Sequence, residues 1–202
     1  MLIVVRHGRT VSNASGLLLG RADPDLDEVG RAQAAALASH LGPIDRVISS
    51  PLRRARQTAY AIASGGSAAA ALGRRVLDVE IEDRFIELDY GEWDQRPLAD
   101  VSGAEWSAWR ADLNFAPPGG ESLVALGGRV RSALDELAVA SAESDIVVVT
   151  HVSPLKAAVA WALGVDDRIS WRMYVPTAGI VRIATSGGRP SLHAYGETAS
   201  AS

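Results

Sequence analysis

The sequence contains no cysteine, which excludes disulfide bonds, thiolate nucleophiles and zinc sites built from sulfur ligands. It also contains a single lysine, Lys156, among its 20 lysine and arginine residues. The 24 acidic residues leave a net charge of −4, so the chain lacks the basic excess of a protein whose main partner is nucleic acid. A local basic pocket for a small anion is still compatible with this charge.

Long apolar runs are absent as well. The longest stretch of apolar and glycine residues lies near 157–165, far short of the roughly 20 residues that span a bilayer. The first residues lead directly into an apolar strand-like pattern, without the basic segment, apolar segment and cleavage site of a signal peptide. We therefore expect a cytoplasmic protein with no membrane partner, and the lack of cysteine agrees with a reducing compartment.

What the chain does contain is typical of a globular domain, since 48% of its 202 residues are apolar. Short aliphatic runs alternate with stretches of helical period, which predicts an α/β fold with a largely parallel sheet covered on both faces. The expected strands are residues 2–5, 46–49, 76–81, 145–150, 179–185 and 191–195. The expected helices are residues 27–41, 51–64, 103–113, 122–141 and 153–163.

The segments between these elements are expected to be loops. Residues 7–25 show no period and form a long loop, and residues 65–73 form a surface loop or a frayed helix end. In the helix at 27–41, one face is expected to carry the apolar side chains from Val29 to Leu41 toward the core. The clearest expected strand is the one at 145–150, which holds four consecutive aliphatic residues.

Two of the expected strands lead directly to a histidine. Residues 2–5 are followed by Arg6 and His7, and residues 145–150 are followed by His151. In open α/β sheets, functional sites form at the carboxyl ends of the strands. The two histidines are therefore expected to face each other across one pocket.

Arginines and a carboxylate follow two further strands. Arg53 and Arg54 come just after residues 46–49, and Glu87 comes a few residues after 76–81. Guanidinium groups bind phosphate oxygens in a bidentate manner, and a neutral imidazole can act as a covalent nucleophile. A protonated carboxyl group can donate to a leaving alkoxide. These groups together fit phosphoryl transfer, which requires no metal when arginines neutralise the phosphate oxygens.

Five ordered motifs carry a resemblance to a known family. They are RHGRTVSN (6–13), SSPLRRARQTA (49–59), FIELDYGEW (85–93), PPGGES (117–122) and VVTHVSPLK (148–156). Over nearly the whole chain they resemble the motifs of the histidine phosphatase superfamily, also called phosphoglycerate mutase-like. Within it, the pattern is most similar to the alpha-ribazole phosphatase-like and broad acid phosphatase branch.

This resemblance implies a fold and a set of site residues. The fold would be a three-layer α/β/α sandwich with a mostly parallel mixed sheet, one domain over residues 1–202 with a small lid-like insertion at about 92–118. His7 would be the nucleophile that becomes phosphohistidine, Glu87 the proton donor and His151 a further catalytic residue. The residues that would bind the substrate phosphate are Arg6, Asn13, Gly20 and Arg54. Arg54 is preferred to Arg53 because the family's arginine directly precedes an alanine.

For some residues, the sequence leaves alternative roles open. Three acidic residues near Glu87 are rivals for the role of proton donor: Glu82, Asp89 and Glu92. Arg9 stands where the family more often has Glu or Gln, and it either adds a cation at the rim of the pocket or points to solvent. Four aromatic residues are interpreted as packing residues in preference to a wall that stacks on substrate: Trp93, Trp106, Trp109 and Phe115.

The resemblance implies a metal-independent phosphatase that hydrolyses a phosphate monoester of a small metabolite, with no cofactor. Phosphoglycerate mutase is the alternative, but mutases of the family carry a long basic insertion between the segments matching Trp93 and Pro117. Here that stretch is short, and Arg96 and Arg110 are its only basic residues. A non-catalytic phosphate-binding regulatory protein of the same fold is a second alternative, although the nucleophile, the arginines and the second histidine are all present. A homodimer is considered as well.

Overall fold

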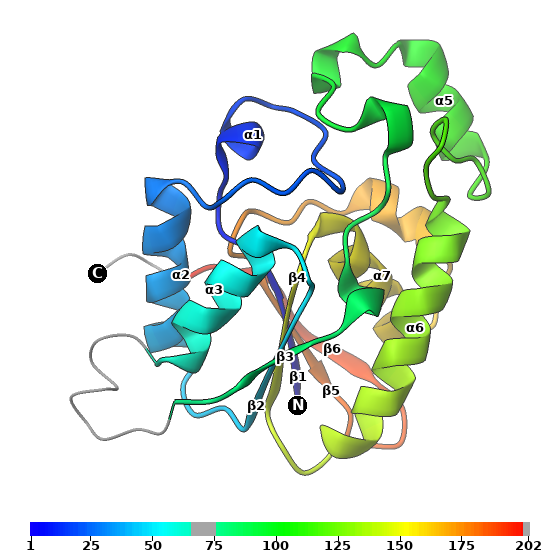
Figure 1. Cartoon of the computed structure of the whole chain (residues 1–202). Helices are drawn as coiled ribbons and strands as arrows, with labels where there is room; N and C mark the ends of the chain where they lie inside the picture. The colour runs from blue at the N-terminus through cyan, green and yellow to red at the C-terminus, as the bar shows by residue number, and fades with distance from the viewer. Residues whose placement is uncertain (66–75, 200–202) are drawn as a thin grey trace.

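The aliphatic runs of the sequence form the strands of one central sheet (Figure 1). The computed structural model describes residues 1–65 and 76–199. Within them the strands are β1 (Leu2–Arg6), β2 (Arg46–Ser49), β3 (Val79–Ile81), β4 (Ile146–Thr150), β5 (Ile180–Ala184) and β6 (Ser191–Glu197). The helices are α1 (Val11–Ala14), α2 (Glu28–His40), α3 (Arg53–Ala63), α5 (Gly103–Ala111), α6 (Leu123–Ala140) and α7 (Val152–Leu163).

The sheet has the strand order β3-β2-β4-β1-β5-β6. The pairs β3–β2, β2–β4 and β4–β1 are parallel. Strand β5 pairs antiparallel with β1, and β6 pairs antiparallel with β5. The expected mostly parallel mixed sheet is therefore confirmed. Arg6 is level with Thr150, and Ser49 is level with Val149, so the carboxyl ends of the three central strands meet at one edge.

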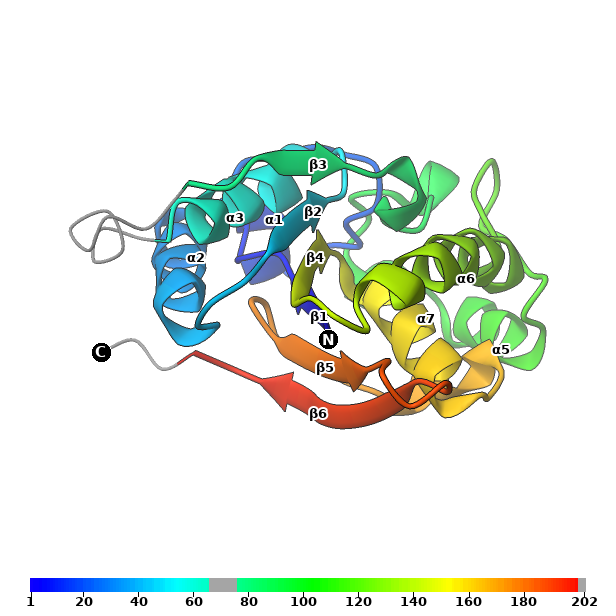
Figure 2. The same cartoon turned by 90° about the horizontal axis from the view of Figure 1, so that it is seen from below.

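Helices cover both faces of the sheet, with α2 and α3 on one face and α6 and α7 on the other (Figure 2). Alternate side chains of β1 enter the two cores, since Leu2 and Val4 pack with α6 and α7 while Ile3 and Val5 pack with α2 and α3. The three-layer α/β/α sandwich is confirmed.

The structure corrects two details of the expected elements. Strand β3 begins at Val79, not at residue 76. The expected loop at 65–73 lies almost entirely outside the described residues and is not tested. The exposed Val29 does not belong to the buried face of α2, which is built from Gly30, Ala34, Leu37 and Ala38. Small residues form this face because α2 packs closely against the chain after β1, where a Cβ on Gly30 would lie 2.0 Å from the carbonyl oxygen of Arg9.

Several short helical segments were not expected. Among them, the four-residue helix α1 lies within the expected loop at 7–25, and a 3₁₀ segment runs over Asp167–Arg172. Both are shorter than the stretch over which helical periodicity can be recognised. Helix α1 is instead recognisable from its cap, because the Thr10 hydroxyl accepts from the Asn13 amide while the Asn13 side chain accepts from Thr10.

Helix α5 lies at the same end of the molecule as α1, the end where the parallel strands terminate (Figure 1). Trp93 and Trp109 are buried there, which confirms their interpretation as packing residues. Whether residues 92–118 act as a lid stays a prediction. None of the described helices is long and apolar enough to cross a bilayer.

Candidate active site

The first residue after β1, His7, is buried at the carboxyl edge of the sheet and only 3% exposed. Its Nδ1 lies 2.7 Å from the carbonyl oxygen of Gly8. A carbonyl can only accept, so Nδ1 carries the ring proton and Nε2 is the unprotonated nitrogen, which accepts from Arg54 Nε at 3.3 Å. Burial and the nearby charges of Arg54 and Arg6 hold the pKa of His7 well below its usual value. The imidazole is thus neutral and oriented, as a nucleophile must be.

The glycine after His7 is required by close packing. A Cβ on Gly8 would lie 2.4 Å from the carbonyl oxygen of Gly30, so any larger residue would push the loop away from α2. The Gly8 amide is also fixed, because it donates to the hydroxyl of Thr58 on α3 at 3.0 Å. The close packing against Gly30 and the hydrogen bond to Thr58 together fix Gly8, whose carbonyl group orients His7.

His151 follows β4 and lies beside His7, with ring centroids 5.0 Å apart. Its Nε2 is 2.6 Å from the hydroxyl of Ser50, the first residue after β2. Burial is the largest cause that holds the pKa of His151 well below its usual value, so the ring is neutral. If Ser50 donates to Nε2, then Nδ1 bears the proton, and this buried atom has no acceptor among residues 1–65 and 76–199. His151 can therefore offer a hydrogen bond to an anion beside His7.

Two buried guanidinium groups flank the histidines. Arg54, fully buried in the first turn of α3, donates to the carbonyl oxygens of Gly20 and Ala22 at 2.7 Å each. Its Nε lies 3.3 Å from Nε2 of His7. Burial lowers the pKa of Arg54 to about 10, so the group stays charged at neutral pH. These contacts hold a cation beside the proposed nucleophile.

Arg6, at the end of β1, is the second cation. Its Nη1 donates to the carbonyl oxygen of Val175 at 2.6 Å, and its buried Nε meets no acceptor in the described part of the chain. Burial lowers the pKa of Arg6, which means that its charge is poorly solvated. Leaving a buried donor unpaired costs roughly 1–3 kcal/mol. An anion bound here would relieve that cost.

Glu87 reaches the same edge from the segment after β3. The Thr150 hydroxyl at the end of β4 donates to the carbonyl oxygen of Phe85 at 2.6 Å and anchors this segment. The Glu87 carboxyl group accepts from the backbone amides of Leu88, Val152 and Ser153 at 2.7, 3.1 and 3.2 Å. These bonds favour the ionised form, but burial outweighs them and raises the pKa of Glu87. Burial thus favours the protonated form that a proton donor needs.

A cavity of about 150 Å³ is lined by Arg6, His7, Asn13 and Glu87. Arg54 and His151 do not line it, and they reach the site through their contacts with His7. The Oδ1 of Asn13 accepts from Thr10, which leaves its Nδ2 to donate toward a ligand. No three or more His, Asp or Glu side chains gather as a candidate metal site in the described ranges. The structure thus brings four predicted site residues to one cavity.

The loop residue Gly20 does not line that cavity. Its amide donates to Asp94 at 2.8 Å and its carbonyl oxygen accepts from Arg54. Both backbone polar groups are therefore engaged, and Gly20 supports the Arg54 side chain. A direct contact between Gly20 and a substrate phosphate stays a prediction.

The rivals of the predicted residues lie elsewhere. Arg53 is exposed and pairs with Asp25, unlike the buried Arg54. Arg9 pairs with Asp27 at 2.8 Å and does not line the cavity. The acidic rivals of Glu87 do not line it either: Glu82, Asp89 and Glu92.

Three further residues near the site were missed by sequence reasoning. Ser50 orients His151, and its position directly after a strand was the available signal. Lys156 and Trp171 line a second cavity beside the first, together with Trp106 and Trp109. Trp106 and Trp109, interpreted from the sequence as packing residues in preference to a wall, therefore line this cavity as well as pack.

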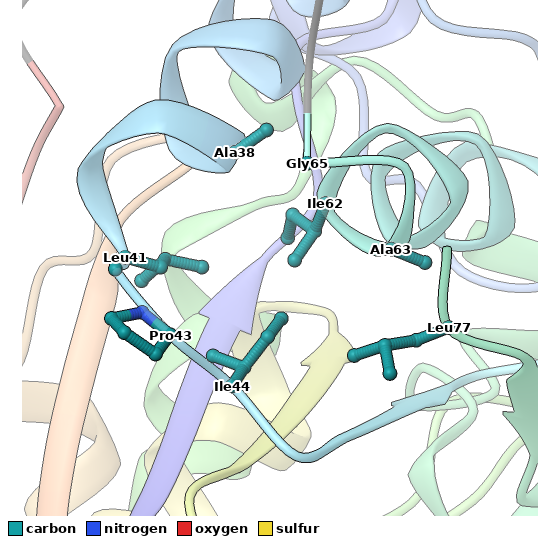
Figure 3. Close-up of a pocket in the computed structure, with 9 residues that line it drawn as sticks. Ala38, Leu41, Pro43, Ile44, Ile62, Ala63, Gly65 and Leu77 are labelled. Atoms are coloured by element: carbon teal, nitrogen blue, oxygen red, sulfur yellow. The ribbon is translucent and has the colours of Figure 1, made fainter. Parts of the chain in front are cut away.

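Another cavity, of about 230 Å³, lies between α2 and α3 near the strand β2 (Figure 3). Its lining is apolar throughout, with Leu41, Pro43, Ile44, Ile62 and Leu77 among the side chains (Figure 3). It offers no titratable or nucleophilic group. The chemistry of the chain is therefore located at the carboxyl edge of the sheet.

This fold, with two histidines, two arginines and a glutamate at one sheet edge, defines a phosphoryl-transfer type of site. The sequence matches the histidine phosphatase superfamily (branch 1) over residues 2–198. The chain belongs to this family.

Known proteins of the family resemble it over most of its length. A bifunctional protein of Mycobacterium tuberculosis is 34% identical over 185 residues, which are 89% of this chain and 48% of that protein. An adenosylcobalamin/alpha-ribazole phosphatase of Salmonella typhimurium is 31% identical, with 86% of this chain and 85% of the relative covered. A solved structure of a mycobacterial glucosyl-3-phosphoglycerate phosphatase with VO3 superimposes with a TM-score of 0.82, at 29% identity and 98% coverage of both chains. The chain spans about half the length of the first of these relatives.

Proposed function

We propose that this chain is a metal-independent phosphatase that hydrolyses phosphate monoesters of small metabolites through a phosphohistidine on His7. The observation that carries the proposal is the environment of His7. Its Nδ1 donates a hydrogen bond to the Gly8 carbonyl oxygen, and its ring is kept neutral. The buried cations Arg54 and Arg6 lie beside it. A neutral nucleophile among preorganised cations is what attack on a phosphate dianion requires.

In the first step, Nε2 of His7 attacks phosphorus, and the ester P–O bond breaks as the N–P bond forms. Arg6, Arg54, His151 and Asn13 stabilise the charge on the phosphoryl oxygens. Glu87 transfers its proton to the leaving alkoxide, so that a neutral alcohol departs. Oε2 of Glu87 accepts only one long backbone bond, and it is the carboxyl oxygen with more capacity to carry this proton.

In the second step, water attacks the phosphohistidine. The Glu87 carboxylate accepts a proton from this water, the N–P bond breaks, and its electron pair returns to Nε2. Inorganic phosphate leaves, with the histidine and the protonated carboxyl group restored. The hydrogen bonds of His7 and Glu87 thus hold the nucleophile and the proton donor in position for both steps.

Two of the three relatives named above support hydrolysis in preference to mutase chemistry, because one is an adenosylcobalamin/alpha-ribazole phosphatase and the other a glucosyl-3-phosphoglycerate phosphatase. The short segment between Trp93 and Pro117 supports the same choice. A cytoplasmic location and a homodimer stay predictions that follow from the sequence alone.

The test is to measure the products formed from p-nitrophenyl phosphate and from 3-phosphoglycerate in buffer that contains a chelator. We expect inorganic phosphate from both substrates. Interconversion of phosphoglycerates without release of phosphate would identify a mutase. No turnover of any ester, together with retained phosphate binding, would favour the regulatory protein of the same fold.

A further inference from the structure

The catalytic cavity continues into a second cavity of about 170 Å³. The two share Leu18, Tyr90, Leu98 and Val152 in their walls, so they lie side by side. The first cavity holds the groups that bind and transfer phosphate. The second is thus in the position where the alcohol part of a phosphate ester would lie.

Indole rings form much of the second cavity. Trp106 and Trp109 are stacked with an interplanar angle of 8° and centroids 5.6 Å apart, and Trp171 meets Trp109 edge-on at 5.1 Å. Interlocked rings of this kind make a rigid wall. The buried Nε1 atoms of Trp109 and Trp171 have no hydrogen-bond acceptor within residues 1–65 and 76–199. The wall therefore combines apolar surface with unused donors.

Lys156, the only lysine of the chain, lines the same cavity. Lys156 lies on α7 one turn after Val152, about 6 Å along the helix axis from a residue that lines both cavities. Burial lowers the pKa of Lys156, while the charge of Glu87 acts in the opposite direction. No hydrogen bond or ion pair joins its ammonium group to another described residue. It is a partly desolvated cation that faces a mainly apolar space.

We propose that this second cavity is the leaving-group subsite, and that Lys156 binds a carboxylate carried by the alcohol part of the substrate. The inference rests on the proposed phosphatase function and names its substrate class, phosphate monoesters of small hydroxy acids. Lys156 is the only cation that lines the cavity, and Arg110 stacks on Trp106 and Trp171 without lining it. One cation matches the single charge of a carboxylate and would not balance a second phosphate.

The position of Lys156 also sets the size of the substrate. Because the backbone of Lys156 is one helical turn from Val152, which lines both cavities, we expect the carboxylate to lie within a few bonds of the ester oxygen. A short hydroxy acid meets this condition, whereas a neutral alcohol leaves the ammonium group unpaired.

The experiment compares 3-phosphoglycerate with sn-glycerol 3-phosphate, which carries a hydroxymethyl group where the first has a carboxylate. We expect the wild-type kcat/KM to favour 3-phosphoglycerate by roughly tenfold or more, since a hydrogen-bonded charge pair of this kind changes binding by about that factor. Lys156→Met should bring the ratio close to one, and Lys156→Arg should retain most of the preference. Arg168→Met, which removes an exposed arginine paired with Asp166, is the matched charge control and should keep the wild-type ratio.

Calorimetric titration of both esters into His7→Ala, with and without Lys156→Met, makes the result independent of turnover. A tighter binding of 3-phosphoglycerate that Lys156→Met removes supports the subsite. If phosphate is released from both esters with the same ratio in wild type and Lys156→Met, and binding is also unchanged, the subsite inference is wrong and the phosphatase stands. If no ester is hydrolysed, the proposed function fails, and the titration alone decides the role of Lys156.

Discussion

Replacing Arg54 by methionine would remove a buried cation while keeping a side chain of similar length. The guanidinium group is completely buried, donates to two backbone carbonyl oxygens and reaches Nε2 of His7. Loss of one preorganised donor at a developing charge costs roughly 2.7–4 kcal/mol in other enzymes. We therefore expect kcat/KM to fall by about 100- to 1,000-fold.

The same change has a cost in stability. The carbonyl oxygens of Gly20 and Ala22 would lose their donor, at about 1–3 kcal/mol for each acceptor that stays buried and unpaired. The thermal midpoint of Arg54→Met must therefore be measured first, so that activity is compared at a temperature where the variant is folded. Arg54→Lys keeps the charge but lacks the planar fork, and should restore only part of the activity.

Arg53→Met is the matched control. Arg53 is adjacent in sequence, exposed, and paired with Asp25 at 2.8 Å. Surface pairs contribute about 0–1 kcal/mol to stability, and this one touches no catalytic group. The assay is hydrolysis of p-nitrophenyl phosphate by both variants. A larger loss in Arg53→Met, or a folded Arg54→Met within tenfold of the wild type, would refute the assignment of the phosphate-binding arginine.

Two further predictions concern proton transfer and protonation. Glu87→Gln should slow the hydrolysis of alkyl phosphates much more than that of aryl phosphates, because an aryl leaving group barely needs the proton; Asp89→Asn, which changes a neighbour outside the cavity, is the control, and equal slowing of both ester classes would point to another acid. Burial keeps the pKa of His7 and His151 below the value near 6.5 of the unfolded chain, so unfolding takes up protons below that pH. The free energy of unfolding is then fully present above about pH 6.5 and falls as the pH drops, by up to about 1.4 kcal/mol per pH unit for each histidine. Urea unfolding at pH 5.5 and 7.5 should show this loss of unfolding free energy in the wild type and a smaller loss in the double variant His7→Asn/His151→Asn. An equal loss in both proteins would contradict the prediction.

The layered fold was predictable because the signals for it are local. The aliphatic run of β4 and the helical stripe of Leu126, Val130 and Leu134 in α6 both indicate burial without any knowledge of partners. The face of α2 was not predictable in the same way. Its buried residues are small because the chain after β1 passes close to Gly30, and this tertiary contact leaves no periodic trace in the sequence.

The same distinction applies to the site. His7 and His151 could be placed together because each follows a strand of a parallel sheet, and the strand register then brings them side by side. The contacts of Gly20 and Lys156 could not be placed, since they depend on how loops and α7 pack around the cavity. The tryptophans are the clearest example, because the sequence does not distinguish an indole that only packs in the core from one that also lines a cavity.

The most direct test of the proposed mechanism is to trap the covalent intermediate. The enzyme would be mixed rapidly with a labelled phosphate monoester, quenched in base, where phosphohistidine persists, and digested for mapping of the labelled residue. The mechanism predicts an acid-labile label on His7, absent in His7→Ala and still formed in His151→Ala at a lower rate. A label on a serine, or full activity in His7→Ala, would contradict the assignment of His7 as the nucleophile.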